Sequence, residues 1–283
     1  EHKKLKITVN KKKLRKFLAG ALCIGAIVLV YGLFFHAKDQ SAMTPTCLPS
    51  ARVSMVQKKA ALFPDYFYKE KLSITFDELL KSQRPMVALT FDDGPYTPVT
   101  NRILDSLKKN GGKATFFVLG GRVNNYSDTL KRIVREGNEV GNHSFSHAAF
   151  AKLTDKEIQY QIQETDRRVK EITGYSITYV RTPYGQNDEK IRKNVGKPII
   201  MWSVDSEDWK SKNKDAVFHE IVSSVSDGDI ILMHDLYPST AEACEEIIPY
   251  LRKKGFELVT VSELFYYKNV HPASGSVYRE VHR

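Results

Sequence analysis

The chain has 283 residues, of which 42% are hydrophobic, and this composition allows a substantial core in one large α/β domain or two small ones. Its formal net charge of +10 is concentrated at the N-terminus, where residues 1–16 hold eight Lys or Arg and one acidic residue. The remainder, with 35 basic and 32 acidic residues, is almost neutral. This distribution argues against a basic surface for nucleic acid on the body of the protein, and no nucleic-acid partner is expected.

Residues 17–35 form a run of nineteen residues without a charge. As a helix rising about 1.5 Å per residue, the run is roughly 28 Å long, close to the thickness of the hydrocarbon core of a bilayer. Lys and Arg precede the run and little charge follows it, so the positive-inside rule predicts a cytoplasmic N-terminus and an extracellular remainder. A cleaved signal peptide is disfavoured because the run is too long and no small-residue cleavage pattern follows it. We predict a basic cytoplasmic tail at 1–16 and a transmembrane signal anchor at 17–35.

The segment 36–84 shows no sustained periodicity and contains Pro45 and Pro49. Aromatic residues at 63–68 argue against complete disorder. We predict an extracellular stalk or linker, part of which packs on the domain that follows.

The three cysteines, Cys23, Cys47 and Cys244, have no metal-binding spacing. Leu22 stands where a lipoprotein signal has a small residue before the cysteine, so Cys23 is not expected to carry a lipid. Cys47 and Cys244 could form a disulfide outside the cell, but we expect both to be free thiols.

From residue 85 onward, short apolar segments alternate with segments of helical periodicity. The predicted helices lie near 98–110, 128–136, 154–173, 187–195, 214–225 and 239–254. The predicted strands are 86–91, 114–119, 177–180, 198–204, 229–233 and 258–261. This alternation predicts a parallel sheet and, over residues 85–268, a distorted or incomplete (β/α) barrel followed by a C-terminal tail at 269–283.

Five short polar motifs occur in this region, most of them directly after a predicted strand. They are TFDDGP at 90–95, HSFSH at 143–147, RTPYG at 181–185, DSEDW at 205–209 and LMHD at 232–235. Polar residues at the C-terminal ends of barrel strands are where such a fold builds an active site. The motifs together therefore predict a hydrolytic site, although each one alone is a weak signal.

The first two motifs supply candidate metal ligands. Asp92 and Asp93 end a strand, and Gly94-Pro95 lets the chain turn and re-aim the two carboxylates, although an ordinary turn has the same composition. His143 and His147 are four residues apart and would share one face of a helical turn, a spacing that also arises by coincidence. With one of the two carboxylates they would make a catalytic site for a divalent metal, with Zn²⁺ as the leading ion and Fe²⁺, Co²⁺ or Mn²⁺ as alternatives.

The other motifs supply candidate acid–base and binding groups. Arg181 would keep a neighbouring carboxylate ionised, and a carboxylate such as Asp208 would favour the protonated form of His234. Trp209 offers a face on which a sugar ring can stack, and Leu232 would line a small apolar pocket that fits a methyl group. Each of these residues also has an ordinary structural interpretation, namely a surface arginine, a strand-end histidine or core packing.

The five motifs, in this order, closely resemble the NodB-type polysaccharide deacetylases of carbohydrate esterase family four, over about residues 85–268. The resemblance implies a distorted (β/α) barrel and metal-dependent removal of acetyl groups from sugars. It implies Asp92 as general base, Arg181 as the residue that orients it, and Asp208 as the residue that tunes the acid His234. It implies metal ligands at Asp93, His143 and His147, oxyanion stabilisation by the Tyr184 N–H, and a groove shaped by Tyr184, Trp209 and Leu232. Thr182 departs from the family, which often has proline there.

For substrate, the predicted anchor and outward-facing domain suggest an immobile polymer at the surface of a Gram-positive cell. Peptidoglycan fits best, with N-acetylglucosamine as the target, because the subgroup that acts on N-acetylmuramic acid tends to carry Arg where this chain has Tyr184. The first alternative is a deacetylase of chitin oligosaccharides or acetylated xylan. A catalytically inactive glycan-binding wall protein is a second alternative, and the presence of all the metal ligands and of the base argues against it.

Overall fold

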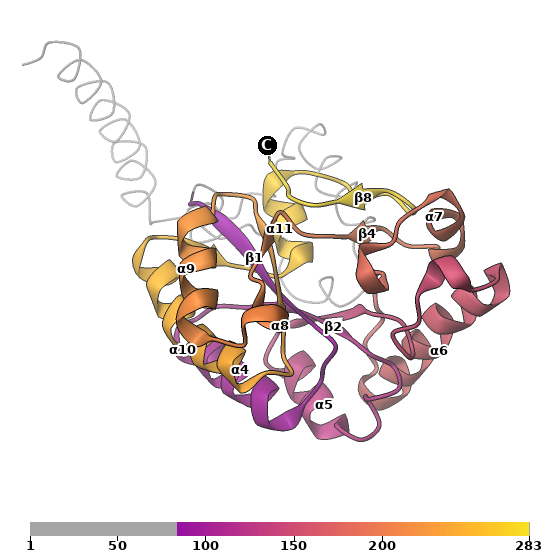
Figure 1. Cartoon of the computed structure of the whole chain (residues 1–283), viewed down its shortest axis with the longest axis horizontal. Helices are drawn as coiled ribbons and strands as arrows, with labels where there is room; N and C mark the ends of the chain where they lie inside the picture. The colour runs from indigo at the N-terminus through magenta and orange to yellow at the C-terminus, as the bar shows by residue number, and fades with distance from the viewer. Residues whose placement is uncertain (1–83, 283) are drawn as a thin grey trace, which may run out of the picture. The chain divides into compact units, whose positions relative to one another are not determined.

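Strand β1 (Met86–Asp92) lies at the centre of a parallel sheet in the computed structural model, which describes residues 84–282. The strand order is β3-β2-β1-β6-β5, and β7 pairs with the start of β1. Figure 1 shows β1 and β2 in the interior of the domain, with helices α4 and α5 outside them. All seven residues of β1 are buried, and apart from Thr90 and Asp92 they are apolar, as expected for a central strand that is covered on both faces. The other strands of this sheet are β2 (Thr115–Val118), β3 (Glu139–Asn142), β5 (Val204–Asp205), β6 (Ile230–His234) and β7 (Glu257–Leu258).

Backbone pairing closes this sheet into a distorted barrel. Val180 bridges Asn142, at the end of β3, on one side and Ile199 on the other. Ile199 begins the short strand β4 (Ile199–Ile200), and the same stretch of chain continues into β5, which pairs with β6. The pairing therefore passes from β3 through Val180 and the β4–β5 segment back to β6, as the predicted barrel requires.

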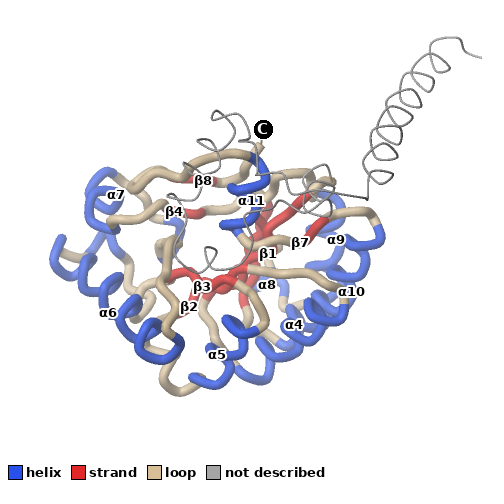
Figure 2. The backbone as a smooth tube through the Cα atoms, turned by 180° about the vertical axis from the view of Figure 1, so that it is seen from behind, coloured by secondary structure: helices blue, strands red, loops and turns tan. Residues whose placement is uncertain are grey.

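Helices surround the strands (Figure 2). The six predicted helices all form, with bounds shifted by at most about two residues, and local signals account for several of their ends. Thr154 and Glu157 make a capping box at the start of α6, and Gly174, at φ 73°, ends that helix. The helices are α4 (Thr97–Lys109), α5 (Ser127–Arg135), α6 (Asp155–Thr173), α7 (Glu189–Val195), α8 (Asp208–Ser211), α9 (Lys214–Ser224), α10 (Pro238–Lys253) and α11 (Val261–Lys268).

Three predicted strands differ in the structure. In the segment 177–180, only Val180 takes part in strand pairing, through isolated bridges. In the segment 258–261, Leu258 is the last residue of β7, and Thr260 is already the N-cap of α11. The segment 198–204 is divided into β4 and β5. It divides because the carbonyl groups of Ile200 and Met201 accept hydrogen bonds from the buried Arg181 side chain. Strand β3 and the short elements α8 and α11 were not predicted.

The predicted domain end at residue 268 lies too early. Strand β8 (Val277–Tyr278) pairs in parallel with β4, and Val281 is buried with its N–H donating to the carbonyl of Gly228. Residues 269–282 therefore complete the fold rather than form a separate tail.

The predicted cytoplasmic tail, signal anchor and stalk, and also Cys47, lie outside the described residues. Within residues 84–282, no helix combines the length and apolarity needed to cross a bilayer. Cys244 is a buried free thiol on α10.

Candidate active site

The predicted site residues meet at the C-terminal ends of the barrel strands. Asp92 ends β1 and is in register with His234, the last residue of β6. His143 directly follows β3, and Arg181 directly follows the bridge at Val180. Parallel pairing places all these strand ends at one rim, so residues from distant motifs become neighbours.

Asp93 and the two histidines form a compact cluster of possible metal ligands. Asp93 Oδ1 lies 3.5 Å from His143 Nε2 and 3.5 Å from His147 Nε2. This oxygen is buried without a hydrogen-bond partner in the protein. A buried carboxylate oxygen without a donor is unfavourable unless a cation compensates it, so the arrangement fits a bound divalent metal ion.

The loop that carries the histidines is not a helical turn, contrary to the sequence-based prediction. Ser144 and His147 both have left-handed backbones, with φ values of 71° and 58°. Asn142 Oδ1 accepts the Ser144 N–H at 2.8 Å, and Ser144 Oγ accepts the His147 N–H at 2.9 Å. These side-chain bonds hold a tight loop that turns both Nε2 atoms toward Asp93. Asp93 itself has a left-handed backbone, with φ 72°, and its carboxylate and that of Asp92 both lie near His143 Nε2, at 3.5 Å and 3.7 Å.

The tautomer of His143 follows from its hydrogen bond. His143 Nδ1 lies 2.7 Å from the Arg181 carbonyl oxygen, and a carbonyl can only accept, so Nδ1 carries the proton. Nε2 then presents a lone pair toward Asp93, as a metal ligand must. Burial, together with the proximity of His143, lowers the pKa of His147 and favours its neutral form as well.

Arg181 and Asp92 form a buried ion pair. Arg181 Nη1 donates to Asp92 Oδ1 at 2.8 Å and to Thr90 Oγ1 at 2.7 Å, and the arginine is fully buried beneath the rim. Its guanidinium also lies 4.3 Å from the ring centroid of Phe117. Burial lowers the pKa of Arg181, and the charge of Asp92 and its hydrogen bond oppose that effect. Asp92 Oδ2 lies 3.7 Å from His143 Nε2 and remains directed at the metal cluster.

Asp208, which begins α8 just after the neighbouring strand β5, holds His234. Asp208 Oδ1 lies 2.8 Å from His234 Nδ1, and Asp208 Oδ2 accepts the His234 N–H at 2.7 Å. The Trp209 N–H and Thr240 Oγ1 complete the bonds to this buried carboxylate. Burial disfavours the charged imidazolium, but the hydrogen bond and charge of Asp208 outweigh burial and raise the pKa of His234 to about 9.

The predicted groove residues surround these groups. Tyr184 is 68% exposed with φ 59°, and its ring packs edge-on against His147 at a centroid distance of 4.6 Å. Trp209 is 48% exposed on α8. Leu232 is buried on the face of β6 that also carries His234, two residues along the strand. Thr182, the departure from the family pattern, donates through Oγ1 to the Gln186 carbonyl at 2.5 Å and thereby closes the turn around Tyr184.

Five residues support the site in ways that the sequence reasoning did not identify. Thr90 bonds Arg181, and Thr240 bonds Asp208. Asp235 accepts from Thr100 on α4, and its carboxylate lies against Gly94, where an added Cβ would stand 2.2 Å from both oxygens. Thr90, Gly94 and Asp235 belong to the motifs at 90–95 and 232–235. Thr100 and Thr240 lie outside the motifs, and their partners Asp235 and Asp208 are 135 and 32 residues away in the sequence.

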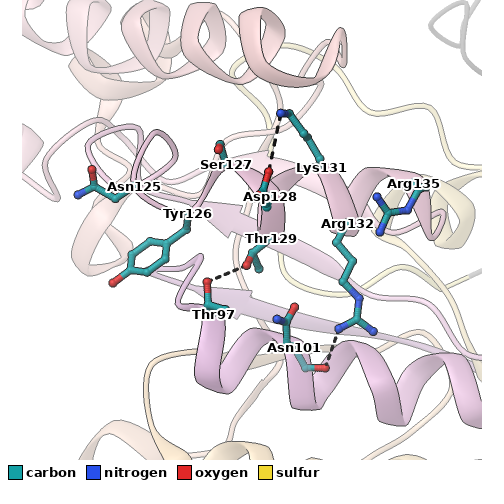
Figure 3. Close-up of a pocket in the computed structure, with 10 residues that line it drawn as sticks. All are labelled: Thr97, Asn101, Asn125, Tyr126, Ser127, Asp128, Thr129, Lys131, Arg132 and Arg135. Atoms are coloured by element: carbon teal, nitrogen blue, oxygen red, sulfur yellow. Dashed lines mark hydrogen bonds and ion pairs between the residues drawn. The ribbon is translucent and has the colours of Figure 1, made fainter.

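A separate polar cavity of about 470 Å³ lies between α4 and α5 (Figure 3). Thr97 and Thr129 are hydrogen-bonded across it at 2.8 Å, and Arg132 reaches the backbone of Asn101. None of its lining residues belongs to the metal cluster or to the acid–base pairs, so this cavity is distinct from the rim site.

Comparison with known proteins finds relatives that are named as deacetylases of peptidoglycan. The family described as polysaccharide deacetylase matches residues 80–197. The chain is 46% identical over 195 residues to the peptidoglycan-N-acetylmuramic acid deacetylase PdaC of Bacillus subtilis, a match that covers 69% of this chain and 42% of PdaC. It is 37% identical over 243 residues to a peptidoglycan-N-acetylglucosamine deacetylase of Bacillus cereus, covering 83% of this chain and 88% of the relative.

Solved structures agree with these relatives. A family 4 acetyl xylan esterase from Clostridium thermocellum, solved with a cobalt ion, superposes with a TM-score of 0.66 at 35% identity, covering 69% of this chain and 98% of the esterase. The chain spans less than half the length of PdaC but most of the Bacillus cereus relative. With the barrel, the metal-ligand cluster and these similarities in agreement, the chain belongs to the polysaccharide deacetylase family.

Proposed function

We propose that this protein is a metal-dependent deacetylase of cell-wall glycan that removes the N-acetyl group from N-acetylglucosamine residues of peptidoglycan. The observation that carries the proposal is the convergence of three units at one rim. They are the Asp93, His143 and His147 cluster, the Asp92–Arg181 pair, and the Asp208–His234 pair. A metal site flanked by a general base and a general acid is the arrangement that hydrolytic removal of an acyl group requires.

Asp92 is suited to act as the general base. Thr90 Oγ1 accepts a hydrogen bond from Arg181 Nη1, and the same nitrogen donates to Asp92 Oδ1, so the carboxylate is held in one orientation. One oxygen of Asp92 is engaged by Arg181, and the other faces the metal cluster, where it would accept the proton of the attacking water. A divalent cation held by Asp93, His143 and His147 would supply Lewis-acid polarisation at this point.

His234 and Tyr184 serve the later part of the reaction. His234 is protonated at neutral pH because of Asp208, and it would donate its proton to the departing nitrogen as the C–N bond breaks. The N–H of Tyr184, which makes no hydrogen bond within residues 84–282, would donate to the acetyl oxygen as that oxygen gains charge. The products are acetate and a sugar with a free amino group.

The target sugar and the cellular location remain part of the proposal. The relatives carry names that refer to both peptidoglycan sugars, and the acetyl xylan esterase has a similar fold. The motif-based preference for N-acetylglucosamine rests on Tyr184. The predicted signal anchor at 17–35 would place the catalytic domain outside the membrane, beside the wall.

The test is acetate release by the full chain, in detergent, from purified peptidoglycan, chitin oligosaccharides and acetylated xylan. Each assay is run with chelator and again after Zn²⁺, Co²⁺ or Mn²⁺ is restored. Metal-dependent release from peptidoglycan supports the proposal, and mass spectrometry of the digested product assigns the deacetylated sugar. Release from chitin or xylan alone would keep the reaction and replace the substrate. Glycan binding without release from any polymer would favour the inactive wall protein.

A further inference from the structure

The rim of the site beside the acid His234 carries a short basic segment. Helix α8 presents the exposed ring of Trp209, and lysines follow at positions 210, 212 and 214. Two of these lysines are neutralised locally, since Lys210 pairs with Glu207 at 2.9 Å and Lys214 pairs with Glu246 at 2.7 Å. Within residues 84–282, Lys212 makes no ion pair.

The side chain of Lys212 lies close to the proposed acid. Lys212 is the C-cap residue of α8, and its N–H donates a hydrogen bond to the Asp208 carbonyl at 3.0 Å. Its φ of 45° lies in the left-handed region, which is unfavourable for residues that carry a Cβ. Its Nζ lies 5.4 Å from the ring centroid of Tyr237. The Tyr237 ring in turn lies 6.1 Å from the ring of His234, so a single aromatic ring separates this cation from the acid of the reaction.

The nearby carboxylate cannot neutralise Lys212. Asp208 is fully buried and already accepts hydrogen bonds from Trp209, His234 and Thr240. A cation held over an aromatic face keeps its charge and its remaining donors available to an anion from solvent. Lys212 therefore presents a positively charged donor beside Tyr237, three residues after the predicted sugar platform Trp209.

We propose that Lys212 binds a carboxylate of the glycan and so directs the enzyme to an acidic polymer in preference to a neutral one. This inference rests on the proposed function and names the chemistry that its substrate must carry. In peptidoglycan the neighbour of each N-acetylglucosamine has a lactyl group, whose carboxyl is free or extended by a peptide with carboxylates of its own. Chitin has the same target sugar and no carboxylate, so the two polymers differ in the feature that Lys212 would recognise.

The experiment compares K212Q with the full-length wild type on three soluble substrates of matched length, with the metal restored. They are peptidoglycan strands with intact peptides, strands whose peptides have been removed by an amidase, and chitin oligosaccharides. We expect K212Q to raise the ratio of KM on the anionic strands to KM on chitin by at least threefold, and K212R to restore it. The wild-type KM on the anionic strands should rise with NaCl, and in K212Q this salt dependence should be weaker.

The matched controls are K210Q and K214Q, which remove the same charge from lysines that already have carboxylate partners and should leave the ratio at the wild-type value. A K212Q effect on intact strands alone assigns the peptide carboxylate, and an effect on amidase-treated strands alone assigns the lactyl carboxylate. An effect on both kinds of strand shows that Lys212 accepts either carboxylate. An unchanged ratio in K212Q, or an equal change in all three variants, overturns the inference. Acetate release by the wild type from chitin and peptidoglycan in those same assays shows that the proposed function stands independently. No release from any substrate refutes that function itself.

Discussion

The guanidinium of Arg181 lies 2.8 Å from the Oδ1 atom of Asp92, and both side chains are buried beneath the rim of the barrel. The same guanidinium also donates to the carbonyls of Ile200 and Met201, at the point where one strand divides into β4 and β5. One side chain therefore orients the proposed base and stabilises the irregular edge of the barrel. The catalytic geometry and the distortion of the fold have a common cause.

Replacing Arg181 tests this double role. In R181M the charge of Asp92 is left buried and unpaired, which should lower the free energy of unfolding by about 3–5 kcal/mol and the kcat by about 100-fold or more. Denaturant unfolding and acetate release measure the two effects. The double variant R181M/D92N should recover much of the stability and none of the activity. If the double variant is no more stable than R181M, the charge imbalance is not the source of the loss.

Of the two adjacent aspartates, we expect Asp93 to bind the metal and Asp92 to act as the base, so variants of the two should differ. D93N and H143A each remove a proposed ligand, so calorimetric titration with Zn²⁺ or Co²⁺ should show affinity reduced by at least about 10-fold. D92N removes the base and leaves the three ligands in place, so it should bind metal and release little acetate. Equal loss of metal affinity in D92N and D93N would show that Asp92 is itself a ligand.

The ion pair of His234 predicts a pH-dependent contribution to stability. Asp208 raises the pKa of His234 from 6.5 to about 9, so the contribution is fully present below pH 6.5 and is lost as the pH rises through about 9. The difference in unfolding free energy between the wild type and H234Q, measured with chelator present, should therefore shrink between pH 6.5 and 9. In D208N the imidazole resonances of His234 should titrate at a lower pH than in the wild type. A constant difference across this range would mean that His234 is neutral in the folded protein.

Gly94 and Asp235 should be coupled through direct contact. A Cβ at position 94 would stand 2.2 Å from both oxygens of the buried Asp235 carboxylate, so G94A must displace one of the two segments. We expect G94A to lower the melting temperature by several degrees and to weaken metal binding, because Asp93 precedes Gly94. G94A/D235A removes the clashing oxygens and should be more stable than the sum of the single changes predicts. Additive effects would place the strain elsewhere.

The sequence alone was sufficient for the motifs and for the long helices. The ends of these helices depend on interactions between residues close in the chain. Examples are the capping box at Thr154 and the left-handed C-cap Gly174. The buried run of β1 and the polar residues at its end also placed Asp92 and Asp93 at the site. The ligand triad at Asp93, His143 and His147 was predicted, and the three residues lie together in the structure.

Tertiary contacts decided the features that depend on residues far apart in sequence. The two histidines lie in a loop and not in a helical turn. Gln161 of α6 holds this loop, because its Oε1 accepts hydrogen bonds from the N–H groups of Phe145 and Ser146. The strand predicted at 198–204 divides because Arg181, from another motif, donates hydrogen bonds to the carbonyl groups of Ile200 and Met201. Strand β8 forms only because β4 offers it an edge, and Thr240 reaches Asp208 only after α10 has packed on the barrel. Periodicity in the chain cannot reveal such pairings, since each one exists only when the two segments are brought together in space.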